Sequence, residues 1–182
     1  MESFIRYILS NFTLTFFVIG LICSLVAIYR SKKRRSTAVV LESLFKYFCF
    51  WAHGITWIYN GIMHTVFHAT AASFIGWDDS PFQLEVGFAS LGFGIVGLLA
   101  IRKNFGLRLA LIVSTSVFLW GAAGGHIYEI VTKHNLAPGN SGVMLWTGLL
   151  LPVFGYILLY LSHRSQKLKS SYVAMRKEEY AY

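Results

Sequence analysis

Charged residues are scarce in this chain, at 13% of its 182 residues, whereas 55% of the residues are hydrophobic. A water-soluble domain carries roughly 25% charged residues. Several apolar runs approach or exceed the roughly 20 helical residues needed to cross a hydrocarbon core. This composition excludes a large soluble domain. It predicts an all-α, polytopic membrane helix bundle.

Cysteine and acidic residues are also few. Cys23 and Cys49 are the two cysteines and form no CxxC pair, so neither a disulfide framework nor a thiolate metal site is expected. Sixteen basic residues outnumber eight acidic ones, giving a net charge of +8. The basic residues lie in short stretches beside apolar runs, which is the pattern of topology signals and anionic-lipid contact. We therefore expect the lipid bilayer as a partner and no nucleic acid.

Five transmembrane helices account for the apolar runs. Residues 1–161 are predicted to form one transmembrane domain, with helices at about 11–29, 43–75, 81–101, 107–131 and 143–161, and 162–182 a basic cytoplasmic tail. Clusters of lysine and arginine follow the first, third and fifth helices. The positive-inside rule then predicts the N-terminus out and the C-terminus in. The second helix is longer than one crossing needs, so it should tilt or protrude on the cytoplasmic side.

Five ionisable residues interrupt the apolar helices: His64, His68, Glu85, His126 and Glu129. Insertion scales put the cost of a charged side chain at mid-bilayer at about 2.5–3.5 kcal/mol, so such residues are rare and usually functional. The predicted topology places all five at a similar depth in the non-cytoplasmic half. Imidazole and carboxylate are metal ligands. The sequence therefore predicts an intramembrane metal centre.

The spacing of these residues supports shared ligation. His64 and His68 lie one helical turn apart on one face, and so do His126 and Glu129. The second pair resembles, in reverse order, the Glu-x-x-His element of di-iron bundles. Small residues on both faces of the third helix suggest that it is central, with Glu85 pointing into the bundle. Such nitrogen and oxygen donors suit one or two ions of zinc, iron, manganese or copper.

Several neighbouring residues leave the ligand set open. Haem is less favoured, because His53 has no second histidine at its depth and haem would leave the glutamates unexplained. A bond to a neighbouring carbonyl is the simpler interpretation of His53, and His134 is expected to face water. Five residues are possible partners for the ring N–H groups of the histidines: Trp57, Tyr59, Asn60, Gln83 and Tyr128. Ordinary packing is the simpler explanation for each of them. The loop 133–142 could equally cover the site or merely connect two helices.

Three functional classes remain open. A redox or hydrolytic metalloenzyme uses the cluster as a metal centre. A proton- or metal-coupled transporter would use it as a relay, with His53, Thr56, Asn60 and Glu42 as a thin path through the cytoplasmic half. The third class is an assembly subunit or homo-oligomer, in which exposed glycine and aromatic faces contact partner helices. A purely structural polar network is the remaining interpretation of the cluster.

One segment carries a family resemblance. Trp77, the run Ser80-Pro81-Phe82-Gln83 and the pair Glu85-x-Gly87 precede a glycine-rich helix. This W-x-x-S-P-F-Q-x-E-x-G pattern resembles the signature of an uncharacterised family of small bacterial multi-pass membrane proteins. The resemblance implies a bacterial inner membrane and a site that faces the periplasm. It implies no activity.

Overall fold

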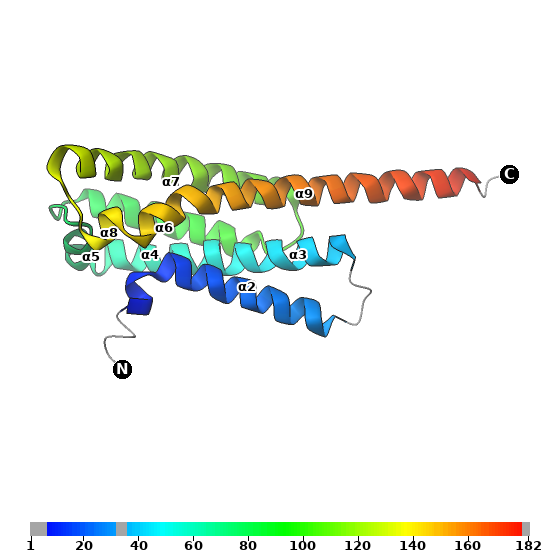
Figure 1. Ribbon diagram of the computed structural model, residues 1–182, viewed down its shortest axis with the longest axis horizontal. Coiled ribbons are helices and arrows are strands. Elements are labelled where there is room, and N and C mark those ends of the chain that lie inside the picture. The colour runs from blue at the N-terminus through cyan, green and yellow to red at the C-terminus, as the bar shows by residue number, and fades with distance from the viewer. Residues whose placement is uncertain (1–6, 32–35, 180–182) are drawn as a thin grey trace.

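The computed structural model describes residues 7–31 and 36–179, and all regular structure in these ranges is helical (Figure 1). The elements are α2 (Phe12–Arg30), α3 (Thr37–Tyr47), the π-helix η1 (Phe48–Ile55), α4 (Thr56–Thr65), α5 (His68–Ile75), α6 (Phe82–Leu99), α7 (Phe105–Lys133), α8 (Pro138–Ser141) and α9 (Val143–Glu179). The long helices run side by side, with α5 and α8 at one end of the bundle. The helix α9 projects beyond the other end.

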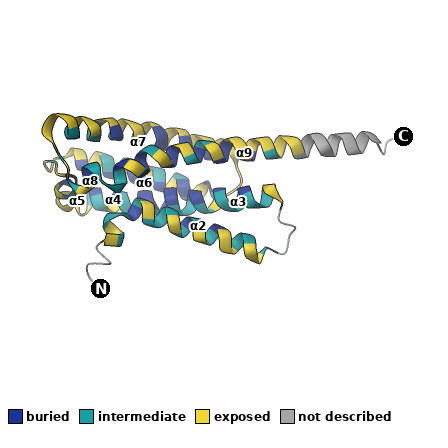
Figure 2. Cartoon of the chain, viewed as in Figure 1, coloured by how far each residue is buried: buried dark blue, intermediate teal, exposed yellow. Residues whose placement is uncertain are grey.

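The outside of the bundle is apolar. Residues such as Leu25, Val117 and Leu150 are each more than 60% exposed, and the exposed faces of α2, α6 and α7 form an outer surface of this kind (Figure 2). Within the described residues, four helical segments are long and apolar enough to span a membrane: Phe12–Arg30, Phe82–Leu99, Phe105–Lys133 and Pro138–Leu168. Hydrocarbon solvates such side chains, whereas the helices satisfy their own backbone groups. The chain is therefore an integral membrane protein, and the predicted helix bundle is confirmed.

The second predicted helix, 43–75, differs from the structure. The helical column begins earlier, at Thr37, and runs without interruption through α3, η1 and α4 to Thr65. It breaks at Val66 and Phe67, where Phe67 leaves the helical region with φ −114° and ψ 36°. Thr65 donates its hydroxyl to the carbonyl of Gly61 (2.7 Å), a back-bond that bends helices. A separate short helix, α5, then begins at His68.

The other boundaries agree closely, with one exception. The predicted helices 11–29, 81–101 and 107–131 match α2, α6 and α7 within two residues at each end. The last helix, predicted over 143–161, continues to Glu179, so most of the predicted tail extends α9. Pro152 lies inside this helix, where it removes one backbone hydrogen bond.

The helix α6 packs against the α3–η1–α4 column through glycines. A Cβ on Gly97 would lie 2.6 Å from the backbone nitrogen of Gly54, and one on Gly94 would lie 2.9 Å from that of Ile58. At Gly87 the same test meets the Thr65 side chain at 2.4 Å and the His64 backbone at 3.2 Å. Only glycine permits this close approach. The opposite face of α6 is exposed, for example at Phe88 (66%) and Ile95 (57%), so this helix lies on the outside of the bundle and not at its centre as predicted.

Apolar residues fill the bundle at the end opposite to α5 and α8. This core contains Leu41, Phe45, Phe48, Cys49, Ala52, Ala100, Leu111, Ile112, Leu151, Leu158 and Leu159. It lies under a buried arginine, Arg108, which is only 2% exposed. We call this half of the bundle the Arg108 end, and the half that carries α5 and α8 the cavity end.

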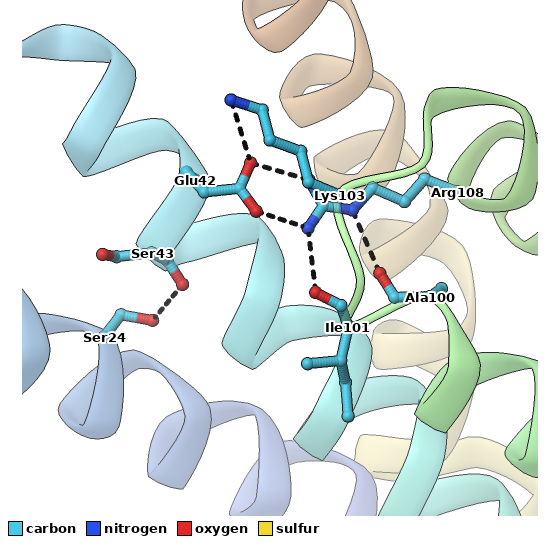
Figure 3. A network of polar contacts seen from close by, with 7 residues as sticks. All are labelled: Ser24, Glu42, Ser43, Ala100, Ile101, Lys103 and Arg108. Atoms are coloured by element: carbon cyan, nitrogen blue, oxygen red, sulfur yellow. Dashed lines mark hydrogen bonds and ion pairs between the residues drawn. The ribbon is translucent and has the colours of Figure 1, made fainter.

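Arg108 joins three helices. Its two terminal nitrogens donate to the two oxygens of Glu42 on α3, at 3.0 and 2.7 Å (Figure 3). Its Nε donates to the carbonyl of Ala100 (3.1 Å), and a terminal nitrogen reaches that of Ile101 (3.4 Å). These carbonyls follow the last turn of α6, where helices leave acceptors without intrahelical donors. Arg108 therefore caps α6 and pairs a carboxylate at once.

Candidate binding cavity

A cavity of about 530 Å³ lies at the cavity end, between α4, α6, α7 and α9. Its size is within the range of small-molecule pockets in proteins. The polar residues on its wall are Thr13, His53, Thr56, Asn60, His64, Asp78, Ser80, Gln83, His126 and Thr147. Most of the remaining wall is apolar or aromatic, including Trp57, Phe118 and Leu151. Three of the six histidines in the chain thus face one chamber.

Two of these imidazoles are held at Nδ1 by side-chain amides. His64 Nδ1 lies 2.5 Å from Oε1 of Gln83, and His126 Nδ1 lies 2.7 Å from Oδ1 of Asn140. An amide oxygen can only accept, so each Nδ1 must carry the proton. In the neutral ring this leaves a lone pair on Nε2. The two rings therefore have hydrogen-bond acceptors, or metal-ligand atoms, that these amides do not use.

The second amide is itself fixed in place. Asn140 is fully buried in α8, and its Nδ2 donates to the backbone carbonyls of Asn135 (2.8 Å) and His126 (3.3 Å). These two bonds require Oδ1 to face the imidazole of His126. Gly139 of the same short helix lines the cavity. The loop 133–142 therefore covers the site rather than merely connecting two helices.

A tight turn returns the chain from α5 to the cavity wall. Gly76 adopts the left-handed conformation (φ 76°), its N–H donates to the Ser73 carbonyl, and that of Trp77 donates to Ala72. This pair of bonds is a Schellman motif, which ends a helix and reverses the chain. Trp77 then stacks on the ring of His126 with centroids 5.1 Å apart. The α5–α6 connection thereby orients one of the cavity histidines.

His53 has a different environment. It lies in the π-helix η1, is 2% exposed, and its two ring nitrogens find no hydrogen-bond partner among the described residues. Its ring packs edge-on against Phe48 and lines the cavity. The expectation that it bonds to a neighbouring carbonyl is therefore wrong. Segments of π-helix occur frequently at functional sites, and a buried polar group without a partner is costly.

The other predicted site residues lie elsewhere. His68 begins α5, so it does not share a helical face with His64, and its Nδ1 lies 2.8 and 2.9 Å from the carboxylate oxygens of exposed Asp79. Glu85 is exposed on α6, so the expectation that it points into the bundle is wrong. Glu129 forms an ion pair with Lys133 at 2.8 Å.

The predicted five-residue set is thus divided. Only His64 and His126 line the cavity, joined by His53. Among the side chains that the structure describes, no three His, Cys, Asp or Glu residues lie close enough to hold a metal ion together. Glu85 points away because α6 uses its glycine face for packing, which turns this carboxylate outward. Spacing within one helix could not show which face would be turned inward.

Sequence reasoning identified some contacts and missed others. Gln83, one of the possible partners for ring N–H groups, does hold His64. Asn140 was not recognised, because its contact with His126 joins two elements and only the turn-rich composition of its loop gave a signal. The thin polar path proposed for transport reaches His53, Thr56 and Asn60 on the cavity wall. Its fourth member, Glu42, belongs instead to the Arg108 pair.

Comparison with known proteins gives one match. No curated protein and no solved structure matches the chain. The model of a family of unknown function (DUF6790) matches residues 10–168, which include every membrane-spanning helix and all the cavity-lining residues named above. The chain belongs to this family of unknown function.

Proposed function

We propose that the chain crosses the membrane five times, with the cavity end on the non-cytoplasmic side. The α3–η1–α4 column supplies the fifth crossing, since helix from Thr37 to Thr65 is about 40 Å long at 1.5 Å per residue. Arg30 ends α2, Lys103 lies in the α6–α7 loop beside Glu42, and Arg164 lies in α9 past the apolar core. These cations at the Arg108 end support a cytoplasmic position for that end. In a bacterial inner membrane the cavity end would face the periplasm.

We propose that the cavity binds a small molecule with an apolar body and hydroxyl or N–H groups. The observation that carries this proposal is the set of imidazoles on the wall. Two have Nδ1 engaged by an amide and Nε2 left as an acceptor, and the ring nitrogens of His53 find no hydrogen-bond partner in the described part of the chain. Acceptors without donors in an apolar chamber favour a ligand that supplies donors.

The first test compares 4-hexylphenol with hexylbenzene, which lacks the hydroxyl group. Both are added to the protein in lipid nanodiscs, and the shift in melting temperature gives the affinity. We expect the phenol to bind about tenfold more tightly, since a net hydrogen bond contributes about 0.5–1.5 kcal/mol. His64→Phe should remove much of this preference, whereas His68→Phe, outside the cavity, should keep it. Equal binding of the two compounds to the native protein would contradict the proposal.

A transition-metal centre is the second candidate. Metal-bound histidines almost always donate their other ring N–H to an acceptor, as His64 and His126 do here. In a metal centre of this kind, the ion would draw together the imidazoles of His64, His126 and His53 as its ligands. Its chemistry would be redox or hydrolytic. Elemental analysis after expression in metal-supplemented medium tests it. Bound zinc, iron, manganese or copper that is lost in His126→Asn but kept in His134→Asn would support this candidate over the first.

We also propose that the segment Trp77 to Gly87 is a signature of the family because its residues build part of the wall of the cavity. Trp77 orients His126, Gln83 holds His64, and Gly87 admits the backbone of α4. Family members should therefore keep these three residues more strictly than Glu85, which is exposed. An alignment in which Glu85 is invariant and Gln83 varies freely would contradict this assignment.

A further inference from the structure

The exposed residues of the cavity wall show where the chamber opens. Asp78 and Ser80 lie in the loop before α6, at the rim of the bundle. The other exposed lining residues are Phe82 of α6, at 60%, and Val117 and Gly121 of α7, with Val117 at 69%. These three lie on the two helices that flank one seam of the bundle. Phe82 begins α6 beside the rim, whereas Val117 and Gly121 lie within the apolar span Phe105–Lys133, so the exposure of these two is to the surface that the bilayer covers.

Aromatic rings close this seam toward the Arg108 end. Phe93 of α6 and Phe118 of α7 have centroids 5.5 Å apart, and both contact Trp57, at 5.1 and 5.4 Å. These rings join α4, α6 and α7 and form the floor of the cavity on this side. The opening between α6 and α7 therefore begins above the level of Phe118.

Glycines leave the seam open above this floor. Gly121 and Gly125 line the cavity one turn apart on α7, and a Cβ on either would meet no described atom within 4 Å. By contrast, a Cβ on Gly94 or Gly97 would collide with the neighbouring backbone. The glycines of α6 thus serve close packing, whereas this pair on α7 borders open space.

We infer that the cavity takes its ligand from within the bilayer, through a lateral opening between α6 and α7 at the level of Gly121 and Gly125. The inference rests on the proposed binding function and narrows the ligand to a membrane-dissolved molecule. Such a molecule crosses the seam, and its polar group then reaches His53, which is buried on the cavity wall and has no hydrogen-bond partner among the residues that the structure describes. An apolar opening excludes ions and strongly hydrated solutes, because they would have to leave water first.

The test blocks the seam without disturbing the packing. Gly121→Phe adds a side chain where a Cβ would meet no described atom within 4 Å. Gly124→Phe is the matched control, since a Cβ there also meets no described atom within 4 Å and Gly124 does not line the cavity. The probe is a ring-brominated 4-hexylphenol delivered from vesicles, and quenching of tryptophan fluorescence follows its uptake and release. Because both substitutions introduce phenylalanine, the number of fluorescent tryptophans stays the same.

An obstructed opening slows both directions of exchange. We expect Gly121→Phe to lower the rates of uptake and release by a similar factor, at least tenfold, with less than a threefold change in Kd. Unchanged rates in this variant would overturn the lateral route, as would a higher Kd with unchanged uptake, since the ring would then only fill the chamber. If the native protein binds no phenol, the proposed function fails separately.

A labelling measurement tests the route without any ligand. In a background with Cys23→Ala and Cys49→Ala, Ala123→Cys places a thiol on the cavity wall, where Ala123 is 3% exposed. An alkyl maleimide dissolved in the bilayer should label it, and Gly121→Phe should slow the labelling at least tenfold. The inference would be overturned if a charged, water-soluble methanethiosulfonate labelled this thiol faster than the alkyl maleimide and if Gly121→Phe did not change that rate. Such a result would show access from the rim.

Discussion

The two ends of the bundle handle buried polar groups in opposite ways. At the Arg108 end, the buried guanidinium is satisfied: it binds Glu42 and two backbone carbonyls, and apolar side chains fill the space beneath it. Within the described part of the chain, the small hydroxyl of Ser162 is the buried group at this end that has no partner. At the cavity end, the imidazole of His53 has no partner and borders an open chamber. A buried unpaired polar group is costly, so natural structures carry few of them.

This difference assigns separate roles to the two ends. The Arg108 end supplies stability, because its charge pair and its apolar core leave little to gain from a ligand. In the proposed function, the cavity end gives up stability for binding capacity, as functional sites commonly do. The glycine contacts of α6 connect the two, since they set the position of the π-helix that carries His53. Each prediction below tests one part of this division.

The largest effect is expected from Arg108→Met. The variant leaves Glu42 without its bidentate partner and the carbonyls of Ala100 and Ile101 without a donor. Removing one member of a buried pair costs about 3–5 kcal/mol, and we expect about 3 kcal/mol because Glu42 is partly exposed. Thermal unfolding in nanodiscs measures the loss.

Lys103→Met is the matched control for charge. Its nitrogen lies 3.9 Å from Glu42 and its side chain is 55% exposed, so a loss below about 0.5 kcal/mol is expected. If the two variants lose equal stability, the Arg108 end is stabilised by net charge rather than by the buried contacts. The contrast between the two ends of the bundle would then be wrong.

The next effect is expected from Gly97→Ala. The added methyl group would lie 2.6 Å from the nitrogen of Gly54 and 2.9 Å from the carbonyl carbon of His53. Backbone cannot move aside as a side chain can, so we expect a loss of about 2 kcal/mol in thermal unfolding. Gly92→Ala, which meets nothing within 4 Å, should instead be neutral or gain up to about 1 kcal/mol. A neutral Gly97→Ala would show that this contact does not set the position of η1.

The sequence predicted correctly those features of the fold that depend on one residue type or on a single helix. Apolar length and basic clusters predicted the helices, and the small residues of α6 predicted its close packing against a neighbouring helix, although not its place at the outside of the bundle. The single helix over 43–75 was wrong, because hydropathy is continuous across Val66 and Phe67 while the backbone is not. The break separates His64 from His68 and removes the face that they were expected to share.

The candidate site depended on contacts between elements, which spacing does not encode. Arg108 looked like a topology signal because it lies in a basic cluster, and its burial follows only from the position of Glu42, which is 66 residues away. Likewise, the sequence favoured a bond between His53 and a neighbouring carbonyl, because no second histidine lies at its depth. The structure instead leaves its ring nitrogens without a hydrogen-bond partner among the described residues.

A smaller effect, of opposite sign, is expected from His53→Phe. An aromatic ring without polar atoms removes the buried nitrogens that have no partner, so we expect a gain of about 1 kcal/mol in thermal unfolding together with weaker binding of 4-hexylphenol. Thr56→Val is the control on the same wall, since its hydroxyl already donates to the Trp51 carbonyl at 2.8 Å. That variant should lose about 0.5–1 kcal/mol. A destabilised His53→Phe would mean that the imidazole supports the fold rather than a ligand.

The smallest effect is expected from Glu85→Gln. The carboxylate is exposed on α6 and lies outside the cavity wall, so stability should change by less than about 0.5 kcal/mol, with phenol binding and metal content unchanged. Thermal unfolding, the phenol titration and elemental analysis of the same preparation measure all three. Loss of a bound metal in this variant would instead require α6 to turn Glu85 inward when the ion binds. The glycine contacts with Gly54 and Ile58 would then have to break, and the cavity end would be the mobile half of the bundle.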